Sequence, residues 1–220
     1  MEDRFGPDAV VFVVDDDANV REGLKELLGS VGLKCEVFST TSEFLQRDFS
    51  NEVSCLILDV RLPQLSGLDL QADLVAARIN IPIIFLTGHG DIPMTVKALK
   101  AGAVEFLTKP VREQDLLDAV RLALERDRRR REQDRKIVDL RGRFQSLSPR
   151  EREVMALITR GLMNKQAAAE IGVSEVTVKV HKRSLMKKMG VRSVADLARI
   201  AEVLESENAS ENLGRGRFRA

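Results

Sequence analysis

The sequence lacks several residue types that mark particular classes of protein. It has no tryptophan and no tyrosine, only nine phenylalanines, which disfavours a single-stranded nucleic-acid binder that stacks bases on aromatic rings. Its two cysteines, Cys35 and Cys55, are too few for a disulfide scaffold, and we expect buried thiols rather than one disulfide. No apolar run approaches the roughly 18 residues of a membrane span. The N-terminal segment MEDRFGPDAV has no signal-peptide pattern, so we expect a cytoplasmic protein without a membrane partner.

A strong net charge is also missing, because 35 Lys and Arg residues balance 34 Asp and Glu residues in the 220-residue chain. The balance conceals a division. Residues 1–125 hold 12 basic and 21 acidic residues, whereas residues 126–220 hold 23 and 13. Two parts of opposite charge predict two units with different partners, and the basic part is the candidate for binding nucleic acid.

The acidic part alternates short apolar runs with helical patterns. The runs, each expected to form a strand, are Val10–Val14, Cys35–Phe38, Cys55–Leu58, Ile81–Leu86 and Val104–Leu107. Apolar residues at helical spacing predict helices at Val20–Val31, Thr41–Leu45, Gly67–Arg78, Met94–Leu99 and from near Glu113 onward. This alternation is typical of an α/β fold with a parallel five-stranded sheet, here of the flavodoxin-like order 2-1-3-4-5.

Polar residues follow four of these strands at their carboxyl ends. Asp15 and Asp16 follow the first strand, Asp59 the third, Thr87 the fourth and Lys109 the fifth. The first and third strands are neighbours in the expected order, so the three carboxylates converge at the edge where such sheets bind ligands. Close carboxylates repel one another unless a cation such as Mg²⁺ neutralises them.

An aspartate beside Mg²⁺ can attack a phosphorus atom and form an aspartyl phosphate. The Lys109 ammonium and the Thr87 hydroxyl are placed to stabilise the phosphoryl oxygens. Taken singly, Asp15–Asp17 is equally consistent with a helix N-cap cluster, and Asp59 with a loop carboxylate. The joint position at the strand ends favours one shared site. His89, between two glycines, is expected to be a loop residue.

Four motifs of this part resemble the receiver domain of bacterial two-component response regulators. They are VVDDD at 13–17, ILDVRLP at 57–63, LTGHGD at 86–91 and FLTKP at 106–110. The stretch GHGDIPMTVKALKAG at 88–102 is similar to the nitrogen-fixation branch of the NarL/FixJ family. The resemblance covers residues 9 to about 125 and implies a receiver domain there.

The resemblance implies that a partner histidine kinase phosphorylates Asp59. It implies that Asp59 itself and Asp16 bind Mg²⁺ directly and that Asp15 binds it partly through water. The backbone carbonyl of Arg61 would be a further ligand. These four residues are the expected metal site.

The resemblance also implies a switch in which Thr87 moves toward the phosphate and Phe106 turns inward. Many receivers have tyrosine where Phe106 stands, so this switch lacks a hydroxyl group. Lys109 would pair with the phosphate, and the Lys109–Pro110 peptide bond would be cis. The face formed by the predicted fourth helix, fifth strand and fifth helix would then form a homodimer.

Residues 126–145 form a charged segment that we interpret as a helical linker ending at Gly142. The i,i+4 pairs Glu125–Arg129, Asp127–Arg131 and Glu132–Lys136 favour a solvated helix. A coiled coil is a poor fit, because its seam would contain Asp127, Arg130 and Asp134. A phosphate-contacting patch at 128–131 is the alternative interpretation.

The basic part contains a helix-turn-helix pattern. Ser148–Glu151 is a capping box that opens a helix ending at Gly161. Asn164 is expected to cap a second helix, Lys165–Ile171, which the tight connection Gly172–Ser174 joins to a third helix ending at Met189. A fourth helix from Val194 to about Leu204 completes the unit.

The third helix has two different faces at 100° per residue. Its packing face contains Val178, His181, Leu185 and Met189, with His181 expected to be a packed or cap-bonding residue. Its outer face contains Val176, Val180, Arg183 and Lys187, flanked by Lys179 and Lys182. Major-groove readers use Lys or Arg against guanine and apolar groups against the thymine methyl group. A solvated basic helix with incidental valines is the alternative.

Residues 146–205 resemble the LuxR/NarL-type helix-turn-helix, most closely in TVKVHKRSLMKKMGV at 177–191. The resemblance implies base contacts from Lys179, Val180 and Arg183. It implies phosphate contacts from Lys165, Thr177, Lys182 and Lys187. The tail at 206–220 is expected to be disordered.

The expected architecture is therefore a receiver at 9–125, a linker at 126–145 and an all-α, four-helix DNA-binding domain at 146–205. The expected function is a response regulator that dimerises on phosphorylation, binds promoter DNA and meets RNA polymerase. An Mg²⁺-dependent phosphatase is the alternative, but it needs a second aspartate at the position of Arg61. A DNA packaging protein would leave the acidic part unexplained.

Overall fold

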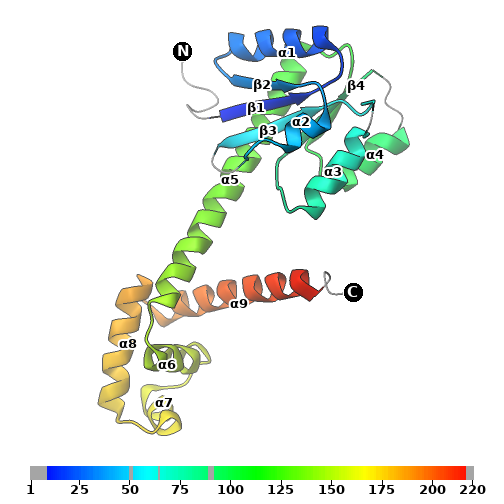
Figure 1. The fold of residues 1–220 in the computed structure, drawn as a ribbon. Coiled ribbons are helices and arrows are strands. Elements are labelled where there is room, and N and C mark those ends of the chain that lie inside the picture. Colours follow the sequence, from blue (N-terminus) through cyan, green and yellow to red (C-terminus); the bar gives the residue numbers. More distant parts are fainter. Residues whose placement is uncertain (1–8, 50–51, 64, 89–91, 217–220) are drawn as a thin grey trace. The chain divides into compact units, whose positions relative to one another are not determined.

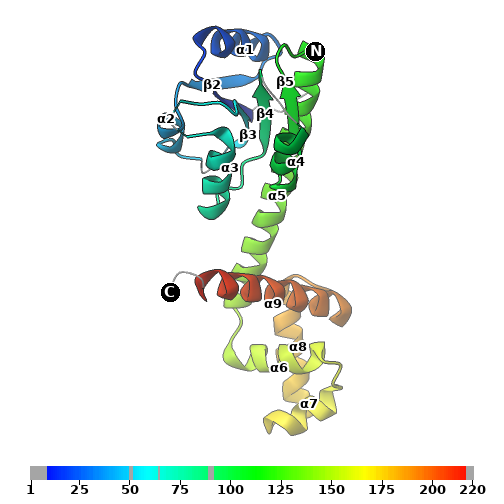
Figure 2. The same cartoon turned by 90° about the vertical axis from the view of Figure 1, so that its right-hand side faces the viewer.

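The computed structural model describes residues 9–49, 52–63, 65–88 and 92–216, with side chains as far as 206. The chain folds as two units, 1–131 and 132–220, whose elements appear in Figures 1 and 2. His89 lies outside the described residues. No helix in the described ranges is long and apolar enough to cross a membrane.

The first unit contains a parallel sheet of order β2-β1-β3-β4-β5, which confirms the predicted order. Its strands are β1 (Ala9–Val14), β2 (Lys34–Phe38), β3 (Val53–Leu58), β4 (Ile83–Thr87) and β5 (Glu105–Thr108). β4 begins later than the predicted Ile81, because Pro82 has no N–H to donate to a neighbouring strand.

Helices cover both faces of the sheet (Figure 1). α1 (Ala18–Ser30) and α5 (Glu113–Gln145) pack on the face that carries Val11 and Val13 of β1. Phe12 and its neighbours on the opposite face pack against three shorter helices, α2 (Thr41–Leu45), α3 (Gly67–Ala76) and α4 (Ile92–Lys100). β1 is buried along its whole length, as its continuous apolar run predicts.

The predicted linker is helical, but two details of the prediction are wrong. α5 does not end at Gly142 but continues to Gln145, because Phe144 packs on the core of the second unit and offsets the cost of about 1 kcal/mol for a helical glycine. The three predicted i,i+4 ion pairs are present. Asp127, however, is fully buried in the first unit rather than solvated.

The second unit is a bundle of helices that follow the end of α5. They are α6 (Pro149–Thr159), α7 (Asn164–Ile171), α8 (Glu175–Met189) and α9 (Val194–Gly216). Its core includes Val154 and Ile158 of α6, Ala167 of α7 and Leu185 of α8. The turn between α7 and α8 begins at Gly172, whose positive φ of 69° suits glycine.

Two helix ends in this unit differ from prediction. The N-cap of α7 is Met163 rather than Asn164: Met163 has extended backbone, and its N–H donates to Gln166 Oε1 at 2.8 Å. α9 extends beyond the predicted end near Leu204, so the expected disordered tail at 206–220 is helical backbone as far as Gly216. Glutamate, alanine and leucine at four positions of 206–216 favour a helix, whereas the serine, asparagine and glycine residues there do not.

Candidate functional site

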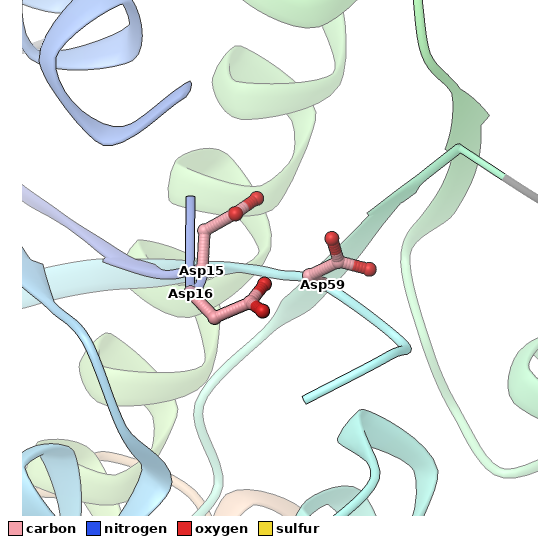
Figure 3. Close-up of side chains that lie close together, drawn as sticks. All are labelled: Asp15, Asp16 and Asp59. Carbon is pink, nitrogen blue, oxygen red and sulfur yellow. The ribbon is translucent and has the colours of Figure 1, made fainter. Parts of the chain in front are cut away.

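Three carboxylates meet at the carboxyl edge of the sheet, as predicted. Asp15 and Asp16 follow β1, and Asp59 follows β3, the neighbouring strand (Figure 3). One oxygen of each carboxylate lies within 4.8 Å of the others. Asp15 and Asp59 are buried, whereas Asp16 is exposed, so the cluster opens to solvent on one side.

Lys109, just after β5, neutralises part of this charge. Its Nζ donates to Asp15 Oδ2 at 2.6 Å and to Asp59 Oδ2 at 2.8 Å. Burial raises the pKa of Asp15, although the hydrogen bond from Lys109 opposes that rise. Burial alone lowers the pKa of Lys109, but its hydrogen bonds to the two carboxylates outweigh burial and raise it. The sequence predicted that Lys109 contacts a phosphoryl group. It did not predict that Lys109 bridges Asp15 and Asp59.

Backbone groups fix the two buried carboxylates. The N–H of Asp17 donates to Asp15 Oδ1 at 2.9 Å, and the N–H of Arg61 donates to Asp59 Oδ1 at 3.0 Å. With three carboxylates and one ammonium, the cluster carries two uncompensated negative charges when all groups are ionised. Hard oxygen ligands with this charge fit a divalent cation such as Mg²⁺, which Asp15, Asp16 and Asp59 could hold.

Two residues that the sequence did not single out shape this edge. Gly67, the first residue of α3, lies against the loop that follows Asp59, and a Cβ atom there would collide with the Asp59 carbonyl oxygen. Its N–H donates to the carbonyl of Val60 at 2.9 Å. Arg21 of α1 donates to the carbonyl of Asp15 at 2.7 Å. The spacing of residues in the sequence does not predict either of these two hydrogen bonds.

The predicted switch residues lie on the two strands beside this cluster. Thr87 is fully buried at the end of β4. Phe106 of β5 is half-buried, and its ring centre lies 5.9 Å from that of Phe85. The Lys109–Pro110 peptide bond is cis, as the resemblance implied.

The second unit presents the predicted basic helix. Val178, Leu185 and Met189 of α8 are fully buried, which confirms the predicted packing face. Of the predicted DNA contacts, Lys182 and Thr177 are half-buried, and the exposed ones are Lys165, Lys179, Val180, Arg183 and Lys187.

The first turn of α8 is well defined. Ser174 caps the helix by accepting the N–H of Thr177 at 3.1 Å, and the two hydroxyls are 2.8 Å apart. Lys179 pairs with Glu175 at 2.8 Å, and this hydrogen bond lowers the pKa of Glu175. The outer face of α8 is therefore exposed and rich in basic residues, with one acidic side chain near its start.

Comparison with protein families assigns both units. Residues 11–121 match the response regulator receiver domain, and residues 145–201 match the luxR family of bacterial regulatory proteins. The sequence is 57% identical over 196 residues to Nodulation protein W of Bradyrhizobium diazoefficiens, covering 89% of this chain and 86% of that protein. This chain belongs to the NarL/FixJ family of response regulators. The family consists of transcriptional regulators, and the regulator is not an enzyme.

Solved structures support this assignment of the regulator. A structure of the response regulator StyR matches with a TM-score of 0.80 and 50% identity, covering 89% of this chain and 98% of that one. Full-length FixJ from B. japonicum matches with a TM-score of 0.54 and 36% identity, covering 90% and 97%. The receiver of the regulator implies a histidine kinase as partner, and its helix-turn-helix implies DNA binding.

Proposed function

We propose that this regulator is a transcription factor switched by phosphorylation of Asp59, which a partner histidine kinase phosphorylates in the cytoplasm. The arrangement that supports this proposal is Asp59 beside two further carboxylates and the ammonium of Lys109. A carboxylate alone is a weak nucleophile toward a phosphoryl group of like charge. A cation site and a lysine at the same carboxylate reduce that repulsion.

The residues that would hold Mg²⁺ are Asp15, Asp16 and Asp59, with the backbone carbonyl of Arg61. Bound there, Mg²⁺ would reduce the repulsion between the carboxylate and the phosphoryl oxygens. In the transfer step an oxygen of Asp59 bonds to phosphorus while the P–N bond of the donor phosphohistidine breaks and the imidazole is released. Lys109 Nζ, which is hydrogen-bonded to Asp59, then donates a hydrogen bond to a phosphoryl oxygen of the product.

Thr87 and Phe106 carry the signal away from Asp59. The Thr87 hydroxyl bonds the new phosphoryl group, and the side chain of Phe106 turns inward on the neighbouring strand. The face of α4, β5 and α5 then forms a homodimer. Dimerisation joins two weakly binding domains into one bivalent reader of two DNA half-sites.

On DNA, α8 lies in the major groove with Lys179, Val180 and Arg183 toward the bases. The residues assigned to phosphate contacts are Lys165, Thr177, Lys182 and Lys187. The exposure and charge of Lys165 and Lys187 support this role, and Lys182 and Thr177 are half-buried beside them with a charge and a hydroxyl group. The bound dimer then contacts RNA polymerase at the promoter.

The phosphorylation step is tested by incubating the full chain with radiolabelled acetyl phosphate and Mg²⁺. We expect label on the wild type and on Asp73→Asn, an exposed carboxylate of α3 that serves as control. We expect none on Asp59→Asn, and none on the wild type after the metal is removed with EDTA. Label that persists on Asp59→Asn contradicts the proposed phosphoacceptor.

A further inference from the structure

Two valines stand exposed on the basic face of α8. The exposed fractions are 68% for Val176 and 62% for Val180, which are among the highest for large apolar residues in the described part of the chain. They are four residues apart in one helix, so they lie on the same side, one turn from each other. Both lie away from the packing face, where Val178 and Leu185 are fully buried.

Stability does not explain Val176. Valine is a poorer helix former than alanine, lysine or glutamate, so an exposed valine in a helix adds nothing to helix stability. Its side chain does not contribute to the core of the second unit. Single exposed apolar residues are common, but Val176 and Val180 stand together on a basic helix face, where both can contact something outside the chain.

The surroundings of Val176 indicate what it contacts. Val176 follows Glu175 in the first turn of α8, and the first turn of the second helix in a helix-turn-helix is the part that meets base edges. The exposed side chains around the two valines include Lys179, Arg183 and Lys187. This positive charge complements the phosphates of DNA rather than a neutral protein surface.

The one acidic side chain nearby does not oppose this contact. Glu175 is held by Lys179 at 2.8 Å, and Lys165 of α7 also lowers its pKa. When Lys179 turns toward a base it leaves this pair, and Lys165 stays as the cation that acts on Glu175.

We propose that Val176 reads a thymine in the major groove by packing against its 5-methyl group, one helical turn before Val180. This inference rests on the proposed DNA binding and extends it to a further specificity-determining residue. The thymine methyl is the apolar group that base pairs present in the major groove, and an apolar side chain is its natural partner. Val176 and Val180 would then favour thymine at two positions of each half-site, on the same helix face as Lys179 and Arg183.

The experiment removes the methyl group from the DNA and the valine from the protein. A preferred duplex is first selected from random sequences by the phosphorylated full-length wild type. Each thymine of the half-site is then replaced singly by uracil, which lacks only the 5-methyl group. We expect one dT→dU change to weaken wild-type binding about fourfold, as for one buried methyl group. We expect the same change to have a smaller effect on Val176→Ala, because the shorter alanine side chain loses most of the contact with the methyl group.

The matched control is Val203→Ala, an exposed valine that belongs to α9 rather than α8. It should bind both duplexes like the wild type. A second variant, Val180→Ala, should lose sensitivity to uracil at a different thymine. Alanine raises helix propensity at both positions of α8, so the variants keep the fold.

The outcomes separate this inference from the function on which it rests. If Val176→Ala weakens binding equally on every thymine and uracil duplex, Val176 does not read a methyl group and the inference is overturned. The same holds if the variant binds like wild type but fails to activate transcription, because Val176 then contacts a protein. If the wild type selects no sequence at all, the proposed DNA-binding function fails as well.

Discussion

At the scale of single residues, Glu151 is the clearest example of a charge used for stability. It opens α6, has an exposed fraction of 4%, and accepts three hydrogen bonds, from Ser148 N and Lys188 Nζ at 2.7 Å and from Ser184 Oγ at 2.6 Å. The bonds from Lys188 and Ser184 lower its pKa to about 2. One carboxylate thus joins α6 to the last turns of α8.

We expect Glu151→Gln to destabilise the second unit by about 1.5–3 kcal/mol at pH 7, the usual range for hydrogen bonds to a charged group. Because folding lowers the pKa of Glu151 below its ordinary value of 4.5, its contribution is present above pH 4.5 and is lost as the pH falls through about 2. The difference in the free energy of unfolding between Glu151→Gln and the wild type should therefore become smaller as the pH falls from 4.5 to about 2.

The measurement is a urea titration at several pH values, followed by the NMR signals of the second unit. Glu153→Gln is the control, since Glu153 is an exposed residue of the same helix paired with Arg150. Such surface pairs contribute little to stability. If Glu151→Gln lowers the free energy of unfolding by the same amount at every pH, the charge of Glu151 is not the source of its contribution to stability.

At the scale of elements, α5 is anchored in the first unit beyond the predicted domain end at 125. The buried carboxylate of Asp127 accepts the N–H of Ser54, at the start of β3, at 3.0 Å. It also accepts Arg131 Nε at 2.6 Å and Arg130 Nη2 at 2.5 Å. Arg131 in turn donates to the carbonyl of Phe49 at 3.4 Å. These contacts extend the first unit to Arg131.

We expect Asp127→Ala to destabilise the first unit by about 1–3 kcal/mol, because it leaves the buried N–H of Ser54 without its acceptor. Alanine favours helix, so the helical backbone at this position is retained. Amide hydrogen exchange should quicken in β3 and in the adjoining turn of α5.

The control is Asp118→Ala, which removes an exposed ion pair with Arg121 from the same helix. Its exchange rates should match those of the wild type. Unchanged protection of β3 in Asp127→Ala would show that this carboxylate does not fasten the helix.

At the scale of the whole molecule, an acidic phosphoacceptor unit is joined to a basic DNA-binding unit. This division lets one chain receive a phosphoryl group and bind a polyanion with different surfaces. We expect acetyl phosphate and Mg²⁺ to double the mass measured by light scattering. We expect affinity for DNA with two half-sites to rise by about 10²–10⁴, the usual gain from bivalency.

DNA with a single half-site distinguishes dimerisation from other mechanisms. Its affinity for the regulator should change little on phosphorylation, because only one DNA-binding unit can engage it. Asp59→Asn should show neither the mass change nor the gain. An equal gain on both DNAs would instead indicate that phosphorylation alters each monomer.

The local pattern of the sequence by itself predicted the helices and strands and most residues of the candidate site. The apolar run at Val10–Val14 predicts a buried strand because both of its faces must be covered, and the order of strands places Asp15 near Asp59. The capping box at Ser148 and the two faces of α8 follow from local hydrogen bonding and helical period. The strand, the capping box and the helix faces depend on spacing within a few residues, so a sequence carries them directly, whereas the strand order follows from the fold class that the alternation of strands and helices predicts.

Tertiary structure alone decided which charges are buried and what they bind. Asp127 looks like a solvated linker residue in the sequence, yet its partner Ser54 lies 73 residues away. The bridge from Lys109 to both Asp15 and Asp59, and the close approach of Gly67 to Asp59, likewise join segments that only the folded sheet brings together. Burial and long-range hydrogen bonds depend on the packing of distant elements, and local spacing does not contain that information.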